Sequence, residues 1–303
     1  MRVAVIDSGV DATHPELVDS VSADSINITN YSDDIRDLVG HGTAIASIIS
    51  ADRNSLGLVG VAPDSDLVVI KASNDNNAFT QSNLLNAISY ANDLNIPIVN
   101  VSLATDATMI PPLREELQLG LDAGRLFVTA AGNTGTDQPQ NPAALATINN
   151  TGALLAVGSV DENNIISGFS NRAGDSRDFF LVAPGEAIVT ADAFRGTIEQ
   201  NGSSISAAFV TGAAATLLSK APHLSGDEIA TILLATAQDL GEVGVDETYG
   251  HGLLRLDRAL LPQGSLVIPG GPAIYSSDLQ TAWTYLSTFS ETVNVANIKG
   301  ALG

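Results

Sequence analysis

Short, continuously apolar runs alternate with longer stretches of helical periodicity along the first 260 residues. The apolar runs are rich in Val, Ile and Leu, which is typical of parallel strands that are buried on both faces. Such strands are expected at Val3–Ile6, Leu67–Lys71, Ile98–Leu103, Leu126–Ala130, Leu154–Val157 and Phe180–Val182. Helices are expected at His41–Ile49, Gln81–Asp93, Leu113–Ala123, Ser204–Ser219 and Gly226–Ala237. The alternation predicts an α/β fold with a doubly wound, mostly parallel sheet and helices on both faces.

The character of the sequence changes near residue 260. Pro and Gly crowd the positions that follow: Pro262, Gly264, Pro269, Gly270, Gly271 and Pro272. A cluster of this kind is typical of a linker, so we predict one domain over residues 1–260 and a linker with a C-terminal extension over 261–303. The most apolar stretch, Ile205–Leu218, is interrupted by polar residues and glycine. It therefore favours a buried helix, and we expect no membrane span in this chain.

Charge and cysteine content narrow the possible functions. The chain has 34 acidic and 13 basic side chains, a formal net charge of -21, and no cysteine. A surface this acidic argues against a nucleic-acid partner, because phosphate binding needs a basic face. It indicates a soluble, self-repelling surface, or else acids that bind cations or suit a salty or extracellular medium. Without cysteine, a disulfide framework, a zinc-cysteine site and a thiol nucleophile are excluded.

Three short motifs carry candidate chemistry: VIDSG at residues 5–9, HGT at 41–43 and NGSS at 201–204. A serine hydroxyl is a weak nucleophile until a base removes its proton, so Ser204 at the start of a predicted helix needs a histidine. Of the four histidines, His41 begins a predicted helix while the others lie in turns or loops. Asp7 ends the first strand and could orient the imidazole. Taken singly, the same residues could be a helix-cap serine and a turn aspartate.

In this order, aspartate then histidine then serine, the motifs resemble the subtilase family of serine peptidases, and the resemblance covers about Arg2 to Leu260. It implies a triad of Asp7, His41 and Ser204. Asn133, in the AAGN motif at residues 130–133, is implied as the oxyanion donor together with the backbone amide of Ser204. The residues implied in substrate binding, by pairing with the peptide as an added strand, are Ser102, Leu103, Ala104, Ala131 and Gly132.

The chain departs from the family's usual residues at four positions. Ser203 stands where threonine is usual, Ile205 where methionine is common, Ala208 where proline is usual and Ala104 where glycine is common. None of these removes a reactive group, so the enzyme reading stands. The methyl group of Ala104 is expected to narrow the pocket for the side chain that precedes the scissile bond. Gln140 is expected near the base of that pocket.

The resemblance also implies a structural Ca²⁺ ion in the loop at residues 52–58. Its ligands would be oxygens, which suit this hard cation. They are the side chains of Glu16 and Asn54 and the carbonyl oxygens of Asp52, Leu56 and Leu58. The other interpretation is an ordinary polar loop, and Glu16 stands where aspartate is usual. No organic cofactor is expected.

The leading functional hypothesis is a serine endopeptidase that cleaves polypeptides through an acyl-enzyme. A peptide ligase or cyclase on the same scaffold is the first alternative, since an amine could intercept the acyl group in place of water. A non-catalytic, peptide-binding subtilase module is the second. The expected partners are polypeptide substrates and a pro-segment, and the expected location is secreted or at the cell surface.

Overall fold

The computed structural model describes residues 1–303 except 75–77, 149–151, 262–265, 268–272 and 275–303. The chain divides into two compact units, Met1–Leu254 and Arg255–Gly303. In the second unit, the described elements are a short helix, α6 (Leu256–Ala259), and an antiparallel pair, β10 (Leu266–Val267) with β11 (Ala273–Ile274). The predicted linker lies largely outside the described residues.

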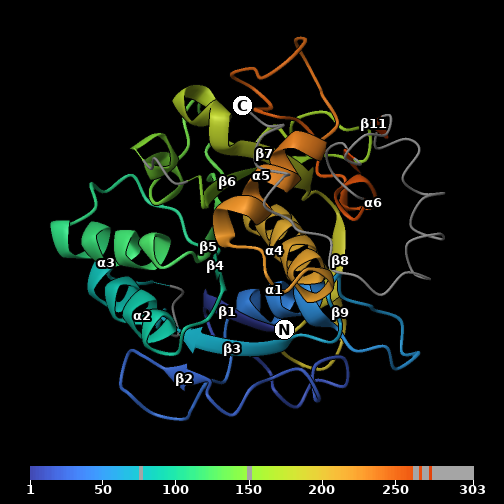
Figure 1. Ribbon diagram of the computed structural model, residues 1–303. Helices are drawn as coiled ribbons and strands as arrows, with labels where there is room; N and C mark the ends of the chain where they lie inside the picture. The colour runs from blue at the N-terminus through green and yellow to red at the C-terminus, as the bar shows by residue number, and fades with distance from the viewer. Residues whose placement is uncertain (75–77, 149–151, 262–265, 268–272, 275–303) are drawn as a thin grey trace. The chain divides into compact units, whose positions relative to one another are not determined.

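The first unit is built on a seven-stranded sheet in the order β2-β3-β1-β4-β5-β6-β7 (Figure 1). Its strands are β1 (Arg2–Asp7), β2 (Ile26–Asn27), β3 (Asp66–Lys71), β4 (Ile98–Val101), β5 (Leu126–Ala130), β6 (Leu154–Val160) and β7 (Phe180–Pro184). Every neighbouring pair is parallel. The predicted α/β fold with a parallel sheet is therefore confirmed. Among the strands of this sheet, β2 alone was not predicted, because a pair of residues carries no periodic signal.

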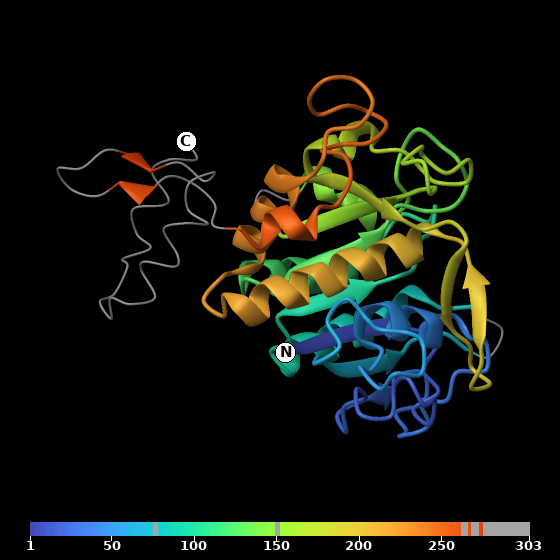
Figure 2. The same cartoon turned by 90° about the vertical axis from the view of Figure 1, so that its right-hand side faces the viewer.

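Helices cover both faces of this sheet. They are α1 (His41–Ser50), α2 (Gln81–Asp93), α3 (Pro111–Asp122), α4 (Ser203–Lys220) and α5 (Gly226–Thr236). Helices α1, α4 and α5 pack on one side, and α2 packs with α3 on the other (Figures 1 and 2). Helix α3 begins two residues before the predicted start because Pro111 and Pro112 fit a first helical turn, where the missing N–H groups have no partner to lose. Ser225 and Glu228 form the predicted capping box of α5.

Helix α4 is the central helix of this unit. Fourteen of its residues are buried, including the polar Ser206 and Thr211, so it presents no solvent-facing polar stripe. Small residues let it approach its neighbours closely: a Cβ added at Gly212 would lie 2.6 Å from the Cβ of Val61. Because α4 is enclosed, its N-terminus, which carries Ser204, is held firmly.

The carboxyl ends of the parallel strands meet at one edge, where ligands bind in sheets of this kind. Asp7 ends β1, and β5 ends three residues before Asn133. The prediction that the strand beginning at Ile98 runs to Leu103 is wrong, since β4 ends at Val101. Residues 102–104 have left the ladder, and Thr105 pairs instead with Asn141 of a distant loop. In the described part of the chain, no helix combines the length and apolar character needed to cross a membrane.

Candidate active site

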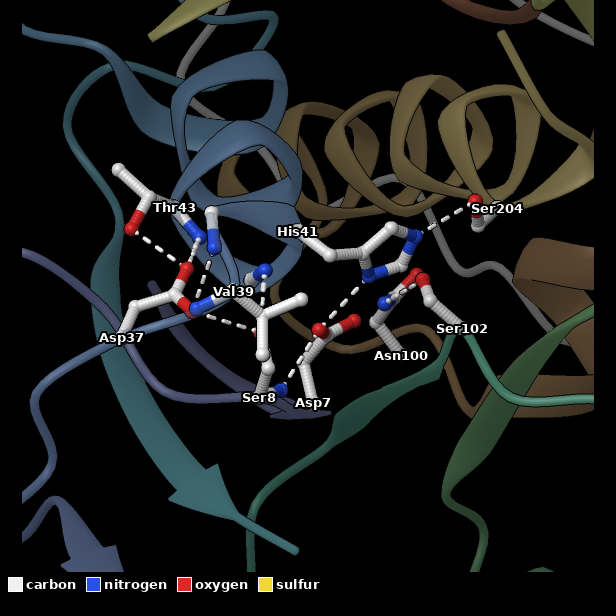
Figure 3. Close-up of polar contacts among 11 residues, drawn as sticks. Asp7, Ser8, Asp37, Val39, His41, Thr43, Asn100, Ser102 and Ser204 are labelled. Atoms are coloured by element: carbon white, nitrogen blue, oxygen red, sulfur yellow. Dashed lines mark hydrogen bonds and ion pairs between the residues drawn. The ribbon is translucent and has the colours of Figure 1, made fainter. Parts of the chain in front are cut away.

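Asp7, His41 and Ser204 form a hydrogen-bonded chain at this edge (Figure 3). The Nδ1 atom of His41 lies 2.8 Å from Oδ1 of Asp7, and its Nε2 atom lies 2.9 Å from Oγ of Ser204. The three residues come from the end of β1, the first residue of α1 and the first turn of α4. With Nδ1 protonated and bonded to the aspartate, Nε2 is free to accept the serine proton. This arrangement matches the three residues that the motifs predicted.

Burial and neighbouring charges set the properties of the Asp7–His41–Ser204 triad. The Asp7 side chain is 1% exposed, whereas the His41 side chain is 26% exposed and can face a substrate. Burial lowers the pKa of His41, but the charge of Asp7, its hydrogen bond and the charge of Asp37 together raise that pKa above its ordinary value. Oδ1 of Asp7 also accepts the N–H of Ser8 at 2.7 Å, while Oδ2 is buried without a hydrogen-bond partner. The carboxylate is thus directed at His41.

Gly42 makes the close approach of α1 to β1 possible. A Cβ added at this position would clash with the carbonyl oxygen of Gly9 and would come within 3.1 Å of Oδ1 of Asp7. The glycine of the HGT motif therefore lets the helix that carries His41 lie against the strand end that carries Asp7.

Asn133 lies beside the candidate nucleophile. Its Oδ1 atom accepts the N–H of Ser203 at 2.8 Å, which leaves the Nδ2 amine free to donate elsewhere. A Cβ added at Gly202 would lie 2.9 Å from Oγ of Ser204 and 3.4 Å from Nδ2 of Asn133. The space between nucleophile and amide is thus kept open by a glycine. A carbonyl oxygen of a bound peptide could receive the amide hydrogen bond there.

Two residues that fix this region were not predicted as site residues. The hydroxyl of Ser203 accepts the N–H of Gly132 at 3.1 Å, a bond that the threonine usual in the family could also make. Asn171 is fully buried; its Nδ2 donates to the carbonyl of Ala131 at 3.1 Å, and its Oδ1 accepts the N–H of Thr134 at 2.9 Å. Together they hold the backbone on both sides of Asn133. No local pattern in the sequence links Asn171 to that loop.

The residues predicted to bind substrate lie next to this chain of groups. Ile6 pairs with Val101, so Asp7 and Ser102 follow at the ends of adjacent strands (Figure 3). The hydroxyl of Ser102 accepts a hydrogen bond from Nδ2 of Asn100 at 2.7 Å. With no sheet partner for residues 102–104 among the described residues, their backbone is available to an extended peptide.

Gln140 lies across the space between the two predicted substrate-binding segments. Its Nε2 atom donates to Oδ1 of Asp106 at 2.8 Å, just beyond Ala104. Its Oε1 atom lies against Gly132, where it would clash with an added Cβ. Its own N–H donates to the carbonyl of Ala131 at 2.8 Å. A side chain that enters between the segments would meet the Gln140 amide.

The predicted calcium ligands lie on two segments that hydrogen bonds join, the segment with Glu16 and the loop at residues 52–58. Oε1 of Glu16 accepts the N–H of Leu58 at 3.1 Å, and its Oε2 is buried without a hydrogen-bond partner. The N–H of Asp52 donates to the Glu16 carbonyl at 2.8 Å, and Oδ1 of Asn54 accepts the N–H of Leu56 at 2.9 Å. The unpartnered carboxylate oxygen suits a hard cation. No group of three or more His, Cys, Asp or Glu side chains positioned for a metal occurs in the described residues, so carbonyl and amide oxygens would have to complete the set.

An aspartate, a histidine and a serine in hydrogen-bonded sequence beside an amide donor define a serine hydrolase. Residues 1–252 match the subtilase family. The chain is 30% identical over 259 residues to Subtilisin DY of Bacillus licheniformis, a match that covers 86% of this chain and 90% of that protein. The protease domain of PatA has a TM-score of 0.73 at 26% identity, covering 86% of this chain and 93% of that chain. The Prenylagaramide maturation protease PagA has a TM-score of 0.72 at 27% identity, covering 86% and 92%.

The chain therefore belongs to the subtilase family and is a serine endopeptidase of the subtilisin-like type.

Proposed function

We propose that the chain hydrolyses polypeptides through an acyl-enzyme on Ser204. The observation that carries this proposal is the continuous hydrogen-bonded chain from Asp7 through His41 to Ser204. His41 takes the hydroxyl proton as Ser204 attacks the carbonyl, and then gives it to the leaving amine. Asp7 holds the imidazole and stabilises its charged form. Asn133 and the Ser204 N–H stabilise the oxyanion, and water releases the acyl group.

A second candidate function is the maturation of a precursor peptide, with release or ring closure of the product. The similarity to the Prenylagaramide maturation protease PagA and to the protease domain of PatA favours it. The two outcomes share the acyl-enzyme and differ in the acceptor, water or an amine.

Product masses from one defined peptide with a free amino terminus separate these outcomes. Hydrolysis adds 18 Da in total to the fragments, which is the mass of one water, whereas ring closure by the peptide's own amine leaves the acyl part without that gain. We expect the hydrolytic masses. Cyclic or ligated products alone would contradict the hydrolase proposal, and no change in mass with any peptide would contradict both candidates.

We further propose that Gln140 restricts the enzyme to small side chains, such as Gly or Ala, before the scissile bond. The contacts of Gln140 with Asp106 and Gly132 support this restriction. Gln140→Ala is expected to raise kcat/KM for substrates with Phe or Leu at that position by about tenfold or more, since pocket fit of this kind is worth 10- to 200-fold. Cleavage profiles of a peptide library measure the change.

Gln138→Ala is the matched control, because Gln138 lies in the same loop and is exposed, with its Oε1 atom accepting the N–H of Asp175. Its profile should equal that of the unmodified enzyme. If Gln140→Ala leaves the profile equally unchanged, the restriction does not come from Gln140.

We also propose that the loop at residues 52–58 binds a structural Ca²⁺ ion with Glu16. The unpartnered, buried oxygen of Glu16 supports the proposal. Removal of Ca²⁺ by a chelator is expected to lower the Tm, because an ion that binds only the folded state stabilises it by mass action. In Glu16→Gln, the chelator should have no further effect. The Tm of the unmodified protein is compared in about 1 mM Ca²⁺ and in about 1 mM chelator without added Ca²⁺. Equal Tm values would count against the site.

A further inference from the structure

Asp37 is a buried carboxylate to which the mechanism above gives no part. It is 5% exposed. Its Oδ1 atom accepts the hydroxyl of Ser8 at 2.9 Å and the N–H groups of Val39 and Gly40 at 3.0 and 2.8 Å. Its Oδ2 atom accepts the N–H and the hydroxyl of Thr43 at 2.9 and 2.8 Å (Figure 3). Both oxygens are therefore fully engaged by donors.

These donors come from the two segments that carry Asp7 and His41. Helix α1 begins at His41, and the glycine before it offers no side chain to cap the free N–H groups of the first turn. Asp37 accepts the Thr43 N–H in place of a cap, and Ser8 Oγ accepts the Gly42 N–H at 2.9 Å. Ser8 also directly follows Asp7 and donates its own N–H to that carboxylate. One side chain thus joins the start of the helix to the end of the strand.

We propose that Asp37 is a positioning residue for the Asp7–His41 pair. It fixes the start of α1 against the segment after β1, so that the imidazole lies in line between Asp7 and Ser204. This inference rests on the proposed function, because it assigns Asp37 a part in aligning that same site. A small displacement of a reacting group can cost about 100-fold in rate, so such a tie has kinetic consequences.

The charge of Asp37 acts in the same direction. Burial raises the pKa of its carboxyl group, but hydrogen bonds from Thr43, Gly40 and Val39 lower that pKa by more, so the group is ionised at neutral pH. The charged groups that face His41 are Asp7 and Asp37, while α4 contributes the uncharged Ser204. Both carboxylates favour the imidazolium that forms during the reaction.

Asp37→Asn keeps the size of the side chain but replaces one acceptor oxygen with an amide NH₂ group. That group would face N–H and hydroxyl donors and could not accept their hydrogen bonds. We expect kcat to fall by about 10- to 100-fold with KM unchanged. The acidic limb of the kcat/KM profile should move to lower pH, because His41 loses a charge that raises its pKa. A fluorophosphonate probe titrates active sites, so that kcat is expressed per reactive serine. Asp33→Asn, an exposed change in the same loop, should alter neither value.

Ser8→Ala cuts the tie between Asp37 and the Asp7 segment without removing a charge. We expect a loss of about tenfold in kcat, with the acidic limb unmoved. Asp37→Asn could instead lower the Tm while kcat per titrated site and the acidic limb stay unchanged. That result would mean a purely structural role for Asp37 and would overturn the proposal. If Asp37→Asn does not fold, an unchanged kcat in Ser8→Ala overturns it. Failure of the unmodified protein to react with the probe would contradict the proposed function instead.

Discussion

Ser204→Ala is expected to lose peptidase activity by about 10⁶-fold, the scale of the loss known for the triad serine of subtilisin. The reason is that His41 Nε2 lies 2.9 Å from the Ser204 hydroxyl and no other described oxygen is bonded to that atom. Alanine leaves the general base with no nucleophile to activate. The variant should fold like the unmodified protein, because Ser204 is a small residue at the start of an enclosed helix. Hydrolysis of a chromogenic peptide amide measures the loss.

Ser203→Ala is the matched control, since it removes a hydroxyl from the adjacent residue. Ser203 bonds the Gly132 N–H and not the imidazole. This variant should still react with a fluorophosphonate probe, with a rate lowered only by the loosened Gly132 loop, whereas Ser204→Ala should not react at all. Equal labelling of Ser204→Ala and the unmodified protein would rule out Ser204 as the nucleophile.

The sheet was predictable because its strands are buried on both faces. Leu67–Lys71 and Leu126–Ala130 are mostly apolar runs of strand length, and each lies within a residue of the observed strand. The position at which a strand ends depends on tertiary contacts. Ser102 and Leu103 were expected to extend the strand that begins at Ile98, yet β4 ends at Val101, and Thr105 pairs with Asn141 of a distant loop. The sequence has no local mark for that pairing.

The same limit applies to the site. Asp7, His41 and Ser204 stand in short motifs whose order is informative, and the structure brings them together as the motifs predicted. Asn171 and Asp37 act mainly through hydrogen bonds to backbone groups, which any sequence supplies, and otherwise through hydroxyl groups distant in sequence or outside any motif. Asp37 alone offered a signal in retrospect: an acidic residue four positions before a histidine that begins a helix with no side-chain cap.

Asp7→Asn is expected to lower kcat by about 10⁴-fold, a loss of the size that this change causes in serine proteases with the same triad. The mechanism follows from the 2.8 Å bond between Asp7 Oδ1 and His41 Nδ1. Oδ1 also accepts the Ser8 N–H, so the asparagine oxygen can keep this position and still face Nδ1, but the negative charge beside the imidazole is lost. Without that charge, the imidazolium that forms when His41 takes the Ser204 proton is no longer stabilised.

The pH dependence of the remaining activity tests whether the lost charge of Asp7 causes the fall in kcat. Asp7 raises the pKa of His41 by its charge and hydrogen bond, so without that carboxylate the acidic limb of the remaining activity should move to lower pH. Asp11→Asn is the matched control, because its carboxylate bonds only Thr13 at the surface, and it should keep both rate and profile. If Asp7→Asn folds, keeps the acidic limb in place and loses less than tenfold in kcat, then Asp7 neither raises the pKa of His41 nor orients its imidazole. In that case His41 would be held by the start of α1 alone, and Asp37 would be the carboxylate whose removal matters more.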